Sequence, residues 1–371
     1  MMMMKKRILQ VTANLYIGGA EKVARDIGFY ADPERYEFHY VVFGNEIGAY
    51  EEDLIARGHK VFHIPSPSSD YAQFVKTLKQ MMLEQHYTAV HAHTMFNCGL
   101  VLYAAKQCGV PIRIAHSHSA WVNEQSSLKI KAYEAAMRRL ILRIATDCVA
   151  CGVEAGNRLF GEKAFQSRGI LILNGIDTVT FSYDESARAR IRSELGWEDA
   201  FVIGHAGHLA SVKNQSFLID LMPAILKRRP NAKLLLLGEG EDRPLLEQKI
   251  AVHNLSHFVK LTGNVMNVSD YLSAMDVFAF PSLFEGMPLA ILEVQANGLP
   301  CVLSTGVPDD VYLTDLIHPV SLGQPERWLQ EICRAKRNGP ERYAQLIYQK
   351  GFDTYSAMKK IFKIYERADQ S

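Results

Sequence analysis

The sequence predicts an α/β protein with two parallel-sheet domains, and three observations support this prediction. From residue 7 to residue 151, short apolar segments of strand length alternate with longer segments of helical periodicity. The alternation breaks at Asn174-Gly175, a turn dipeptide, and resumes from residue 201. The chain has 371 residues, which suits two domains that each bury a core. Because strands that alternate with helices are typical of βαβ units, both sheets are expected to be parallel.

The first half alternates regularly between strands and helices. Its predicted strands are Arg7–Ala13, Glu37–Phe43, Lys60–Ile64, Ala89–His93, Ile112–His116 and Thr146–Cys151. Its predicted helices are Glu51–Arg57, Tyr71–Gln85, Asn97–Gln107 and Leu128–Ile144, with a loop and helix over 17–31.

The second half repeats the pattern beyond a junction near residue 177. Strands are predicted within 201–209, 232–240 and 257–265, at Val277–Phe280 and at 300–304. Helices are predicted at Asn214–Arg228, Leu245–Val252, Val268–Ala274 and Pro288–Asn297. A terminal helix over 351–371 places Tyr355, Met358, Ile361, Phe362 and Tyr365 at helical spacing.

Composition favours a soluble, cytoplasmic protein. The chain is 48% hydrophobic and 22% charged, as globular proteins are. Its net charge of +1 gives no general attraction to nucleic acid. No apolar run approaches the ~20 residues of a membrane span, and we identify no secretory signal at the start. The cysteines are scattered, and Cys148 and Cys151 lack a second pair at zinc spacing, so we interpret all as reduced core residues.

The segment FEGMPLAILE, residues 284–293, holds two carboxylates around a predicted helix start. Pro288 fits the first helical position, and Gly298 ends the helix. Glu285 lies in the loop after a strand, and Glu293 lies in the helix. A helix start binds anions and carboxylates accept hydroxyl donors, so the segment suits a ligand with phosphates and hydroxyls, such as a sugar nucleotide. The alternative is a helix-start carboxylate and a solvated one.

Motifs recur in a recognisable order along nearly the whole chain. They are NLYIGGAEKVARD, VHAHTMFNCG, RIAHSHSAW, LNGIDTVTF, IGHAGHLASVKN, LLLLGEGEDRPLLE, LTGNV and AMDVFAFPSLFEGMPLAILEVQANGLPCV. Together these motifs resemble those of retaining GT-B glycosyltransferases of family 4. The resemblance is strongest to members that build bacterial capsular polysaccharides and exopolysaccharides.

This resemblance implies two Rossmann-like domains that face a cleft, with the last helix crossing back to the N-terminal domain. Residues 1–176 with 352–371 would bind the acceptor, and residues 177–351 the donor. The implied reaction moves a sugar from a nucleotide donor, with UDP preferred, with retained anomeric configuration and without a metal or other cofactor. The implied acceptor is a glycan or a polyprenyl-diphosphate-linked saccharide.

The resemblance also assigns site residues. Glu285 would contact hydroxyls of the donor sugar, Glu293 the ribose, and Lys213 the diphosphate, while Pro288 has no amide hydrogen to offer. The implied donor-binding residues are Gly18, Gly19, Gly207, His208, Lys213, Gly238, Asn264, Val265, Gly286, Met287, Pro288, Leu289 and Glu293. Gly18 and Gly19 would permit close backbone approach and positive φ.

Histidines end two predicted strands. His116 or His118 would line the transferred sugar as a catalytic residue; the pattern does not separate them, and we favour His118. His91 and His93 lie near the acceptor side, where functional and structural roles both remain open.

One position departs from the family pattern. His208 stands where the family carries an arginine that grips the diphosphate with the lysine. A histidine lacks the permanent charge and the bidentate fork of arginine. This departure raises the alternative of a weakly active or non-catalytic sugar-nucleotide-binding subunit of a polysaccharide assembly. A separate alternative, from another class of enzyme, is a GT-B sugar-nucleotide epimerase or a phosphorylase.

The segment Leu128–Ile144 carries an apolar stripe of Ile130, Tyr133, Met137, Leu140, Ile141 and Ile144. Lys131 and Arg138 lie opposite the stripe, and Lys129, Arg139 and Arg143 flank it. We expect a helix packed on its own sheet with a solvated basic face. The alternative is a peripheral contact of this face with anionic lipid at the inner side of the cell membrane.

Overall fold

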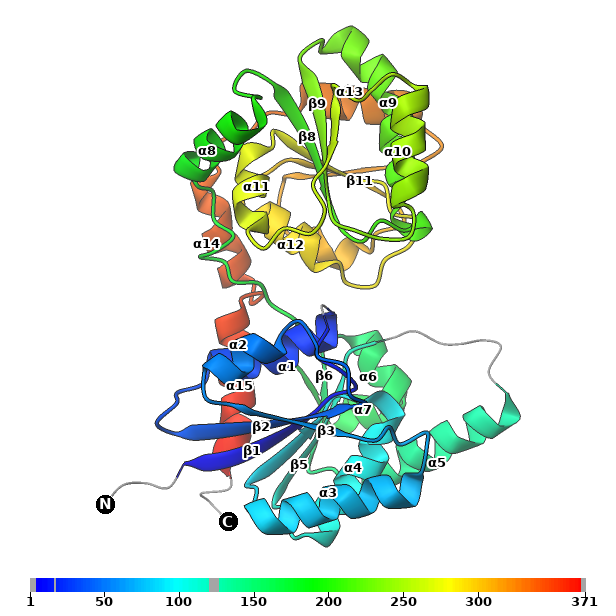
Figure 1. Cartoon of the computed structure of the whole chain (residues 1–371), viewed down its shortest axis with the longest axis vertical. Helices are drawn as coiled ribbons and strands as arrows, with labels where there is room; N and C mark the ends of the chain where they lie inside the picture. The colour runs from blue at the N-terminus through cyan, green and yellow to red at the C-terminus, as the bar shows by residue number, and fades with distance from the viewer. Residues whose placement is uncertain (1–4, 17, 120–126, 368–371) are drawn as a thin grey trace. The chain divides into compact units, whose positions relative to one another are not determined.

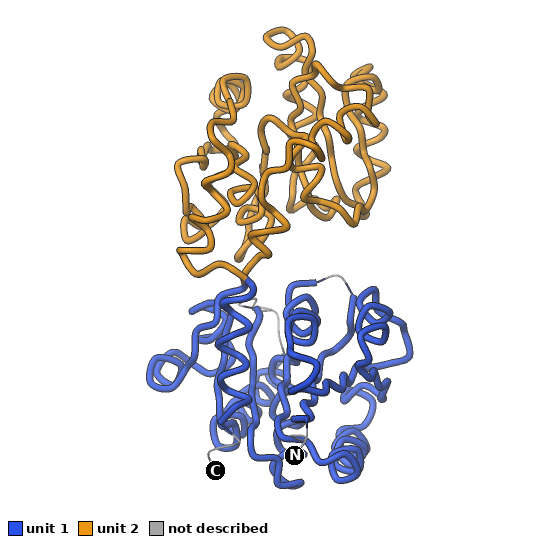
Figure 2. Tube along the Cα trace, turned by 90° about the vertical axis from the view of Figure 1, so that its left-hand side faces the viewer, with its two compact units in different colours: residues 1–174, 354–371 blue, residues 175–353 orange. Residues whose placement is uncertain are grey.

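The computed structural model describes residues 5–16, 18–119 and 127–367. The chain forms two compact units, one of Met1–Asn174 with Thr354–Ser371 and one of Gly175–Asp353 (Figure 2). Each unit contains one sheet in which the strands pair in parallel. The predicted α/β class with two parallel sheets is therefore confirmed.

Unit 1 contains a seven-stranded sheet in the order β3-β2-β1-β4-β5-β6-β7. Its strands are β1 (Lys6–Val11), β2 (Tyr36–Phe43), β3 (Lys60–Ile64), β4 (Ala89–Ala92), β5 (Ile112–Ser117), β6 (Asp147–Ala150) and β7 (Gly169–Leu171). The order reverses between β1 and β4, where successive connections leave in opposite directions.

Helices cover both faces of this sheet (Figure 1). One face is covered by α1 (Gly19–Phe29), α2 (Glu51–Ala56) and α15 (Thr354–Glu366). The other is covered by α3 (Tyr71–Gln85), α4 (Cys98–Gln107), α5 (Leu128–Ile144), α6 (Val153–Phe160) and α7 (Glu162–Arg168), with the short 3-10 turn η1 (Met95–Asn97) before α4. Asp70 caps α3 because its side chain accepts from the amides of Ala72 and Gln73.

The C-terminal helix α15 returns to unit 1, as predicted. Met358, Ile361 and Tyr365 are buried in the core that α15 forms with α1 and the sheet. The ring of Phe362 stacks on that of Tyr36, with centroids 5.4 Å apart. Tyr355, also predicted on the apolar stripe, is instead 48% exposed at the start of the helix.

Unit 2 contains a six-stranded sheet in the order β10-β9-β8-β11-β12-β13. Its strands are β8 (Phe201–Ala206), β9 (Ala232–Leu237), β10 (Val259–Leu261), β11 (Val277–Phe280), β12 (Cys301–Ser304) and β13 (Ile317–Val320). Its helices are α8 (Glu185–Leu195), α9 (Gln215–Arg228), α10 (Arg243–Val252), α11 (Val268–Ala274), α12 (Leu289–Ala296), α13 (Pro325–Arg334) and α14 (Glu341–Gln349), with 3-10 turns η2 (Ser211–Lys213) and η3 (Asp309–Val311). The order reverses between β8 and β11.

Several elements were not predicted from sequence, namely α6, α7, β7, α8, β13, α13 and α14. The sequence of α8, ESARARIRSEL, is mostly polar and lacks a broad apolar stripe. The helix is stabilised instead by its N-cap, Asp184, and by packing on α11. The edge strand β13 contains Pro319, which argues against a strand unless the strand lies at an edge.

Three local predictions were wrong. Pro288 is the N-cap of α12, with ψ of 103°, and Leu289 is the first helical residue. Gly18 has an extended backbone with φ of −160°, and Gly19 begins α1, so neither adopts positive φ. Arg138 does not belong to a solvated face, because its guanidinium donates to the carbonyls of Leu159 and Arg158.

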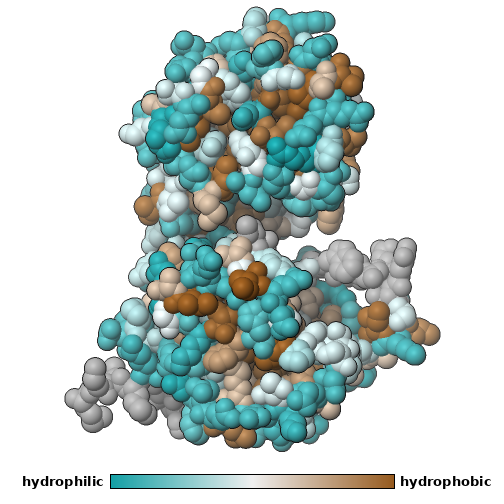
Figure 3. Space-filling model, viewed as in Figure 1, coloured by the Kyte–Doolittle hydropathy of each residue, from teal (hydrophilic) through white to brown (hydrophobic). Residues whose placement is uncertain are grey.

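The outer part of α5 remains exposed. Leu128 is 85% exposed and Ile130 is 47% exposed, whereas Ile141 and Ile144 are buried. Hydrophobic and hydrophilic surface therefore alternate at the outer end of this helix (Figure 3). Among the helices of the described residues, none has the length and apolarity that crossing a bilayer requires. Cys98, Cys148, Cys151 and Cys301 are buried, as predicted for core residues, whereas Cys108 and Cys333 are half-buried.

Candidate functional site

A lysine and a glutamate meet at the strand-order reversal of unit 2. Lys213 lies in η2 after β8, and Glu285 lies in the loop between β11 and α12. Lys213 Nζ donates to Glu285 Oε1 across 2.7 Å, and the two side chains are only 22% and 11% exposed. Such reversals at the carboxyl ends of parallel strands are where open α/β sheets bind ligands.

Backbone contacts hold the two loops together. The amide of Leu283 donates to the carbonyl of Val212 at 2.8 Å, and Asn214 Nδ2 donates to the carbonyl of Pro281 at 3.3 Å. The amide of Glu285 donates to the carbonyl of Gly306 at 3.3 Å. The carboxylate of Glu285 is therefore positioned by the scaffold on both sides.

The amino-terminal end of α12 lies directly beyond Glu285. No acidic residue occupies the first turn of α12, so its partial positive charge is not offset locally. A Cβ added to Gly286 would meet no atom within 4 Å, so the backbone there is accessible. Glu293 lies in the second turn of the helix and is half-buried. Amides at a helix start and a carboxylate further along the helix together offer donors to anions and an acceptor to hydroxyls.

Two glycines allow the loops after β8 and β9 to pack closely. Gly207 and Gly238 have φ of +156° and +130°. A Cβ at Gly238 would lie 2.1 Å from the carbonyl oxygen of Gly207, so a side chain at that position would collide with backbone. Gly238 also bridges Gly263, and Asn264 and Val265 follow directly in the loop after β10.

His208 is paired with a carboxylate at the protein surface. His208 Nε2 lies 2.7 Å from Glu241 Oε2, and the side chains are 62% and 67% exposed. The pKa of Glu241 is lowered by its own backbone amide and by this contact with His208. The imidazole that replaces the expected arginine is therefore not an isolated group.

His205, which the sequence analysis did not single out, lies beneath the same loop. It is fully buried, and its Nδ1 lies 3.0 Å from the carbonyl oxygen of Ala279. Gln215 Nε2 approaches His205 Nε2 at 3.2 Å and donates to the carbonyl of His208 at 2.8 Å. Burial lowers the pKa of His205 to about 4, so this imidazole is neutral. A single histidine within an apolar strand was the signal that could have found it.

Four histidines gather at the corresponding reversal in unit 1. His91 lies on β4 and His93 directly after it, while His116 lies on β5 and His118 directly after that strand. Because side chains alternate across a strand, all four point to the face that α15 covers, as does Gln10 of β1.

The cluster is closely hydrogen bonded. His91 Nε2 lies 3.1 Å from His116 Nδ1, and His93 Nδ1 lies 2.8 Å from His118 Nε2. Gln10 Oε1 lies 2.8 Å from His93 Nε2, and Tyr365 Oη lies 2.7 Å from His91 Nδ1. Gln10 Nε2 donates to Tyr365 Oη at 3.0 Å, which joins the two pairs. Sequence reasoning did not single out Gln10, or find a hydrogen-bonding role for Tyr365.

Burial keeps these imidazoles neutral. It is the first cause that lowers the pKa of His91, His93 and His116 well below the usual value, and the neighbouring imidazoles lower it further. Burial lowers the pKa of His118 to about 3. Ligand nitrogens of His91, His93 and His116 lie within 4.8 Å of one another, as in a metal site, but those of His91 and His93 already take part in the hydrogen bonds described above.

A cavity of about 400 Å³ opens at the carboxyl ends of the unit 1 strands. His93, Thr94, Asn97 and Tyr71 contribute to its lining. The ring of Tyr71 stacks on that of Tyr133, with centroids 5.7 Å apart, and the Tyr133 hydroxyl donates to Asn97 Oδ1 at 2.6 Å. Hydroxyls, an amide and an aromatic face in one hollow suit a polar ligand with an apolar side.

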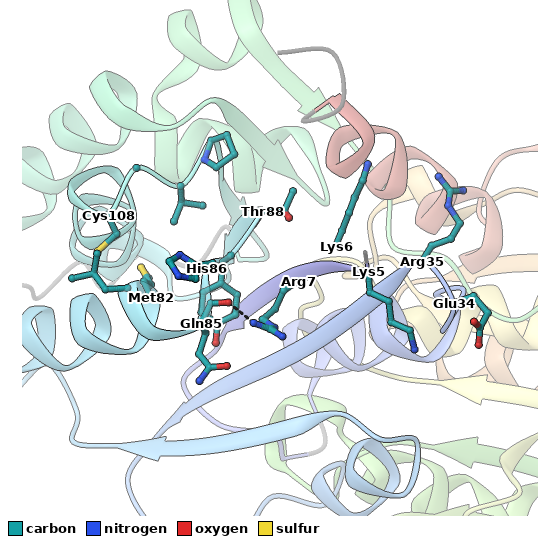
Figure 4. Close-up of a pocket in the computed structure, with 15 residues that line it drawn as sticks. Lys5, Lys6, Arg7, Glu34, Arg35, Met82, Gln85, His86, Thr88 and Cys108 are labelled. Carbon is teal, nitrogen blue, oxygen red and sulfur yellow. Dashed lines mark hydrogen bonds between the residues drawn. The ribbon is translucent and has the colours of Figure 1, made fainter. Parts of the chain in front are cut away.

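A larger cavity of about 810 Å³ lies at the opposite, amino-terminal edge of this sheet, beside Thr88 (Figure 4). Both of its arginines have acidic partners: Arg7 pairs with Glu37 at 2.9 Å, and Arg35 pairs with Glu366 at 2.8 Å. We therefore place the candidate site at the carboxyl edges, not here.

The predicted site residues thus fall into two groups. Unit 2 brings Glu285, Lys213 and the other predicted donor-binding residues of residues 207–293 to the carboxyl edge of its sheet. Gly18, Gly19, His116 and His118 belong to unit 1, at the carboxyl ends of β1 and β5.

Comparison with known proteins identifies the class. Residues 200–336 match the family described as Glycosyl transferases group 1, and residues 17–180 match Glycosyltransferase Family 4. The putative glycosyltransferase EpsF of Bacillus subtilis is 31% identical over 370 residues, which cover 97% of this chain and 96% of that protein. The chain therefore belongs to the group 1, family 4 glycosyltransferases.

Two further similarities are informative. The UDP-Gal:alpha-D-GlcNAc-diphosphoundecaprenol alpha-1,3-galactosyltransferase of Escherichia coli is 27% identical over 233 residues, covering 62% of this chain and 60% of that protein. The crystal structure of Anabaena Alr3699/HepE in complex with UDP superimposes with a TM-score of 0.75 at 21% identity and covers 97% of this chain and 99% of that one. The fold is accordingly that of the GT-B glycosyltransferases.

Proposed function

We propose that the protein transfers a sugar from a nucleotide donor, preferably a UDP-sugar, to a glycan or polyprenyl-diphosphate-linked saccharide with retention of anomeric configuration. The observation that carries the proposal is the Lys213–Glu285 pair at the strand-order reversal of unit 2. A cation for the diphosphate and a carboxylate for sugar hydroxyls lie within one hydrogen bond of each other. The UDP found with the Anabaena structure supports the choice of nucleotide.

The donor diphosphate would lie between Lys213 and the start of α12. Lys213 Nζ has three hydrogens and uses one on Glu285, so it can donate to a phosphate while the ion pair persists. The amides of Gly286, Met287 and Leu289 would add neutral donors, and Pro288 contributes none. Glu293 would accept from the ribose hydroxyls.

Glu285 would act on the transferred sugar. When Lys213 also contacts the phosphate, the carboxylate of Glu285 would accept hydrogen bonds from hydroxyls of the sugar. These contacts would strengthen as positive charge develops at the anomeric carbon. The leaving diphosphate gains negative charge at the same time, and Lys213 with the α12 amides would stabilise it. We propose that these groups replace a metal ion in this role, and that no cofactor takes part.

Unit 1 would bind the acceptor. Its cavity of about 400 Å³ carries hydroxyl, amide and imidazole groups together with the exposed ring of Tyr71, which suits a saccharide. The name of the Escherichia coli relative supports a lipid-linked saccharide as acceptor. The similarity to the capsular polysaccharide biosynthesis glycosyltransferase CapH of Staphylococcus aureus, 24% identical over 310 residues, supports a role in polysaccharide synthesis. His118, with His116 behind it, would face the transferred sugar.

Transfer assays with UDP-glucose, UDP-galactose, UDP-N-acetylglucosamine and GDP-mannose test the proposal. The acceptor would be undecaprenyl diphosphate carrying one N-acetylhexosamine. We expect turnover with one UDP-sugar, an α-linked product by NMR from an α-linked donor, and unchanged rates in EDTA. UDP binding without transfer or donor hydrolysis would instead support the non-catalytic subunit, and a β-linked product would exclude retention.

We propose that the outer end of α5 contacts anionic lipid at the inner face of the cell membrane. Leu128 and Ile130 are exposed there beside Lys129 and Lys131, so apolar and basic groups share one surface. Each basic residue near an anionic surface adds about 1 kcal/mol. Sedimentation with phosphatidylglycerol vesicles should exceed that with phosphatidylcholine vesicles and fall in high salt. Equal binding to both vesicle types would remove the electrostatic contact.

A further inference from the structure

The four clustered histidines, Gln10 and Tyr365 form one continuous hydrogen-bond chain. Its order is His118, His93, Gln10, Tyr365, His91 and His116, and each neighbouring pair lies between 2.7 and 3.1 Å. The chain joins three strands of the sheet to the C-terminal helix. Every inner nitrogen and oxygen of these side chains that can hydrogen bond has a partner within the chain.

The two end nitrogens of this hydrogen-bond chain are its exceptions. His118 Nδ1 and His116 Nε2 are buried and have no hydrogen-bond partner. Their rings are neighbours, with centroids 4.0 Å apart. Buried polar atoms are rarely left unmatched, so each unmatched nitrogen indicates a ligand or water that binds there.

A neutral imidazole has one N–H and one bare nitrogen, so only two proton arrangements satisfy every bond of the hydrogen-bond chain and keep the Tyr365 hydroxyl hydrogen bonded within it. With the Gln10 amide oriented as in the structure, His93 Nε2 donates to Gln10 Oε1, and His118 Nε2 must then donate to His93 Nδ1. On the other side, Gln10 donates to Tyr365, Tyr365 to His91 Nδ1, and His91 Nε2 to His116 Nδ1. All four histidines then carry the proton on Nε2.

Turning the Gln10 amide over reverses every bond, and all four histidines then carry the proton on Nδ1. A mixture of the two tautomers would place two donors or two bare acceptors against each other, or would leave the hydroxyl hydrogen of the buried Tyr365 without an acceptor in the hydrogen-bond chain. The four imidazoles are therefore linked, although His118 and His116 lie at opposite ends.

We infer that Gln10 and Tyr365 are positioning residues that give the four histidines one common tautomer, and that the two ends together bind a hydroxyl group. In the arrangement of the structure, His118 Nδ1 accepts and His116 Nε2 donates; in the reversed one, the roles exchange. Either way the ends offer one donor and one acceptor, which matches a hydroxyl, since it both donates and accepts. The hydroxyl is that of a water or of a sugar.

Nitrogen-15 NMR of the full chain with labelled histidine measures the tautomers directly. We expect His91, His93, His116 and His118 to be neutral and to share one tautomer. A mixed set of tautomers in the wild-type chain would overturn the inference, and this measurement needs no variant. Zinc retained at one ion per chain, with the imidazole nitrogens bound to it, would overturn it equally.

Tyr365→Phe tests the link between the two halves of the chain. Without the hydroxyl, His91 and His116 should no longer follow His93 and His118, so the two pairs should show independent tautomer ratios. Tyr40→Phe is the matched control, because Tyr40 is also buried in unit 1 but donates to the carbonyl of Ala24, outside the chain. Retention of one common tautomer in Tyr365→Phe would contradict the role of Tyr365.

Ligand titration separates the two sources of the hydroxyl, and this step rests on the proposed transferase function. If the hydroxyl belongs to the donor sugar, UDP-glucose shifts the end nitrogens of His116 and His118 and UDP does not. If it is water, neither ligand shifts them. In the first case Tyr365→Phe should also lower kcat roughly tenfold or more with unchanged UDP affinity, since a positioning partner is lost. Failure of transfer alone leaves the tautomer result standing.

Discussion

Lys213 Nζ and Glu285 Oε1 lie 2.7 Å apart, although 72 positions separate the two residues in the chain. The contact arises because β8 and β11 are neighbours in the sheet while β9 and β10 lie on the far side of β8. The ion pair positions both side chains and offsets both charges. Because the two residues are proposed to contact different parts of the donor, substitution of Glu285 should mainly lower turnover and substitution of Lys213 should mainly lower UDP affinity.

Glu285→Gln keeps the size of the side chain and removes its charge. We expect kcat/KM for transfer to fall about 100-fold, or about 2.7 kcal/mol of transition-state stabilisation, because the contacts to sugar hydroxyls weaken. UDP affinity should not fall, since Lys213 loses a competing anion. Glu247→Gln, which alters an exposed pair with Arg243, serves as control and should leave both quantities unchanged. Wild-type turnover in Glu285→Gln would exclude the residue from the site.

Lys213→Met removes the cation proposed for the diphosphate. We expect UDP affinity by calorimetry to fall about 10- to 100-fold, as a hydrogen bond to a charged group is worth roughly 1.5–3 kcal/mol. Lys249→Met is a matched control, because Lys249 is 23% exposed and pairs with Asp220 in the same unit. Equal losses in the two variants would indicate a general effect on unit 2 and not a diphosphate contact.

His208→Arg restores the residue type that the family pattern carries. A guanidinium is permanently charged and offers a planar fork to a phosphate, which an imidazole does not, so by calorimetry the variant should bind UDP more tightly than the wild type. Glu241→Gln removes the present partner of His208 and should free the imidazole for the diphosphate, so it should also tighten UDP binding. UDP affinity unchanged in both variants would show that His208 lies outside the diphosphate contact.

Acid should destabilise unit 1 before unit 2. The pKa values of His91, His93 and His116 are lowered well below normal, and that of His118 is lowered to about 3, by burial in the folded state. Below about pH 6.5 the histidines bind protons in the unfolded chain but stay neutral in the folded one. Protonation therefore favours the unfolded state, and the free energy of unfolding, which is highest above that pH, decreases as pH falls.

The loss amounts to at most about 1.4 kcal/mol per histidine for each pH unit below 6.5. Hydrogen exchange at pH 7.5, 6.5 and 5.5, corrected for intrinsic rates, should show protection falling faster in unit 1. In unit 2, by comparison, burial lowers the pKa of one described histidine, His205. Parallel decline in the two units would argue that the histidines of unit 1 are already protonated.

Ile361→Ala tests how α15 supports unit 1. Ile361 is fully buried, so the cavity should cost about 2–5 kcal/mol of unfolding free energy. Tyr355→Ala, at the exposed start of the same helix, should cost about 0.5 kcal/mol or less. Urea unfolding with hydrogen exchange should localise the loss to unit 1. Similar losses in residues 175–353 would mean that α15 stabilises the whole chain.

The sequence predicted elements best where local signals were strong. The bounds of α3 were predicted to the residue, because Asp70 caps it and its apolar residues recur at helical spacing. The helix α8 was missed because its sequence is mostly polar. It is held by a tertiary contact, the ion pair of the Arg192 guanidinium with Asp276, which is distant in the sequence. No local pattern records such a contact.

The same limit applied to the site. Glu285 and Lys213 stand in recognisable motifs, but their pairing depends on strand order, which the alternation of elements does not fix. Each of the two His-x-His motifs could have indicated a shared face by its spacing of two. Gln10 could not be found this way, since one polar residue in a buried strand carries no sign of its partners.

The return of α15 to unit 1 also orders events during synthesis. Residues 175–353 leave the ribosome before residues 354–366, so unit 2 is complete in sequence before unit 1 receives its last helix. Until Tyr365 emerges, His91 and Gln10 lack the hydroxyl that joins them. The nascent first unit would therefore wait, partly open, through the translation of the whole second one, and a chaperone that recognises exposed apolar surface would find it in that interval.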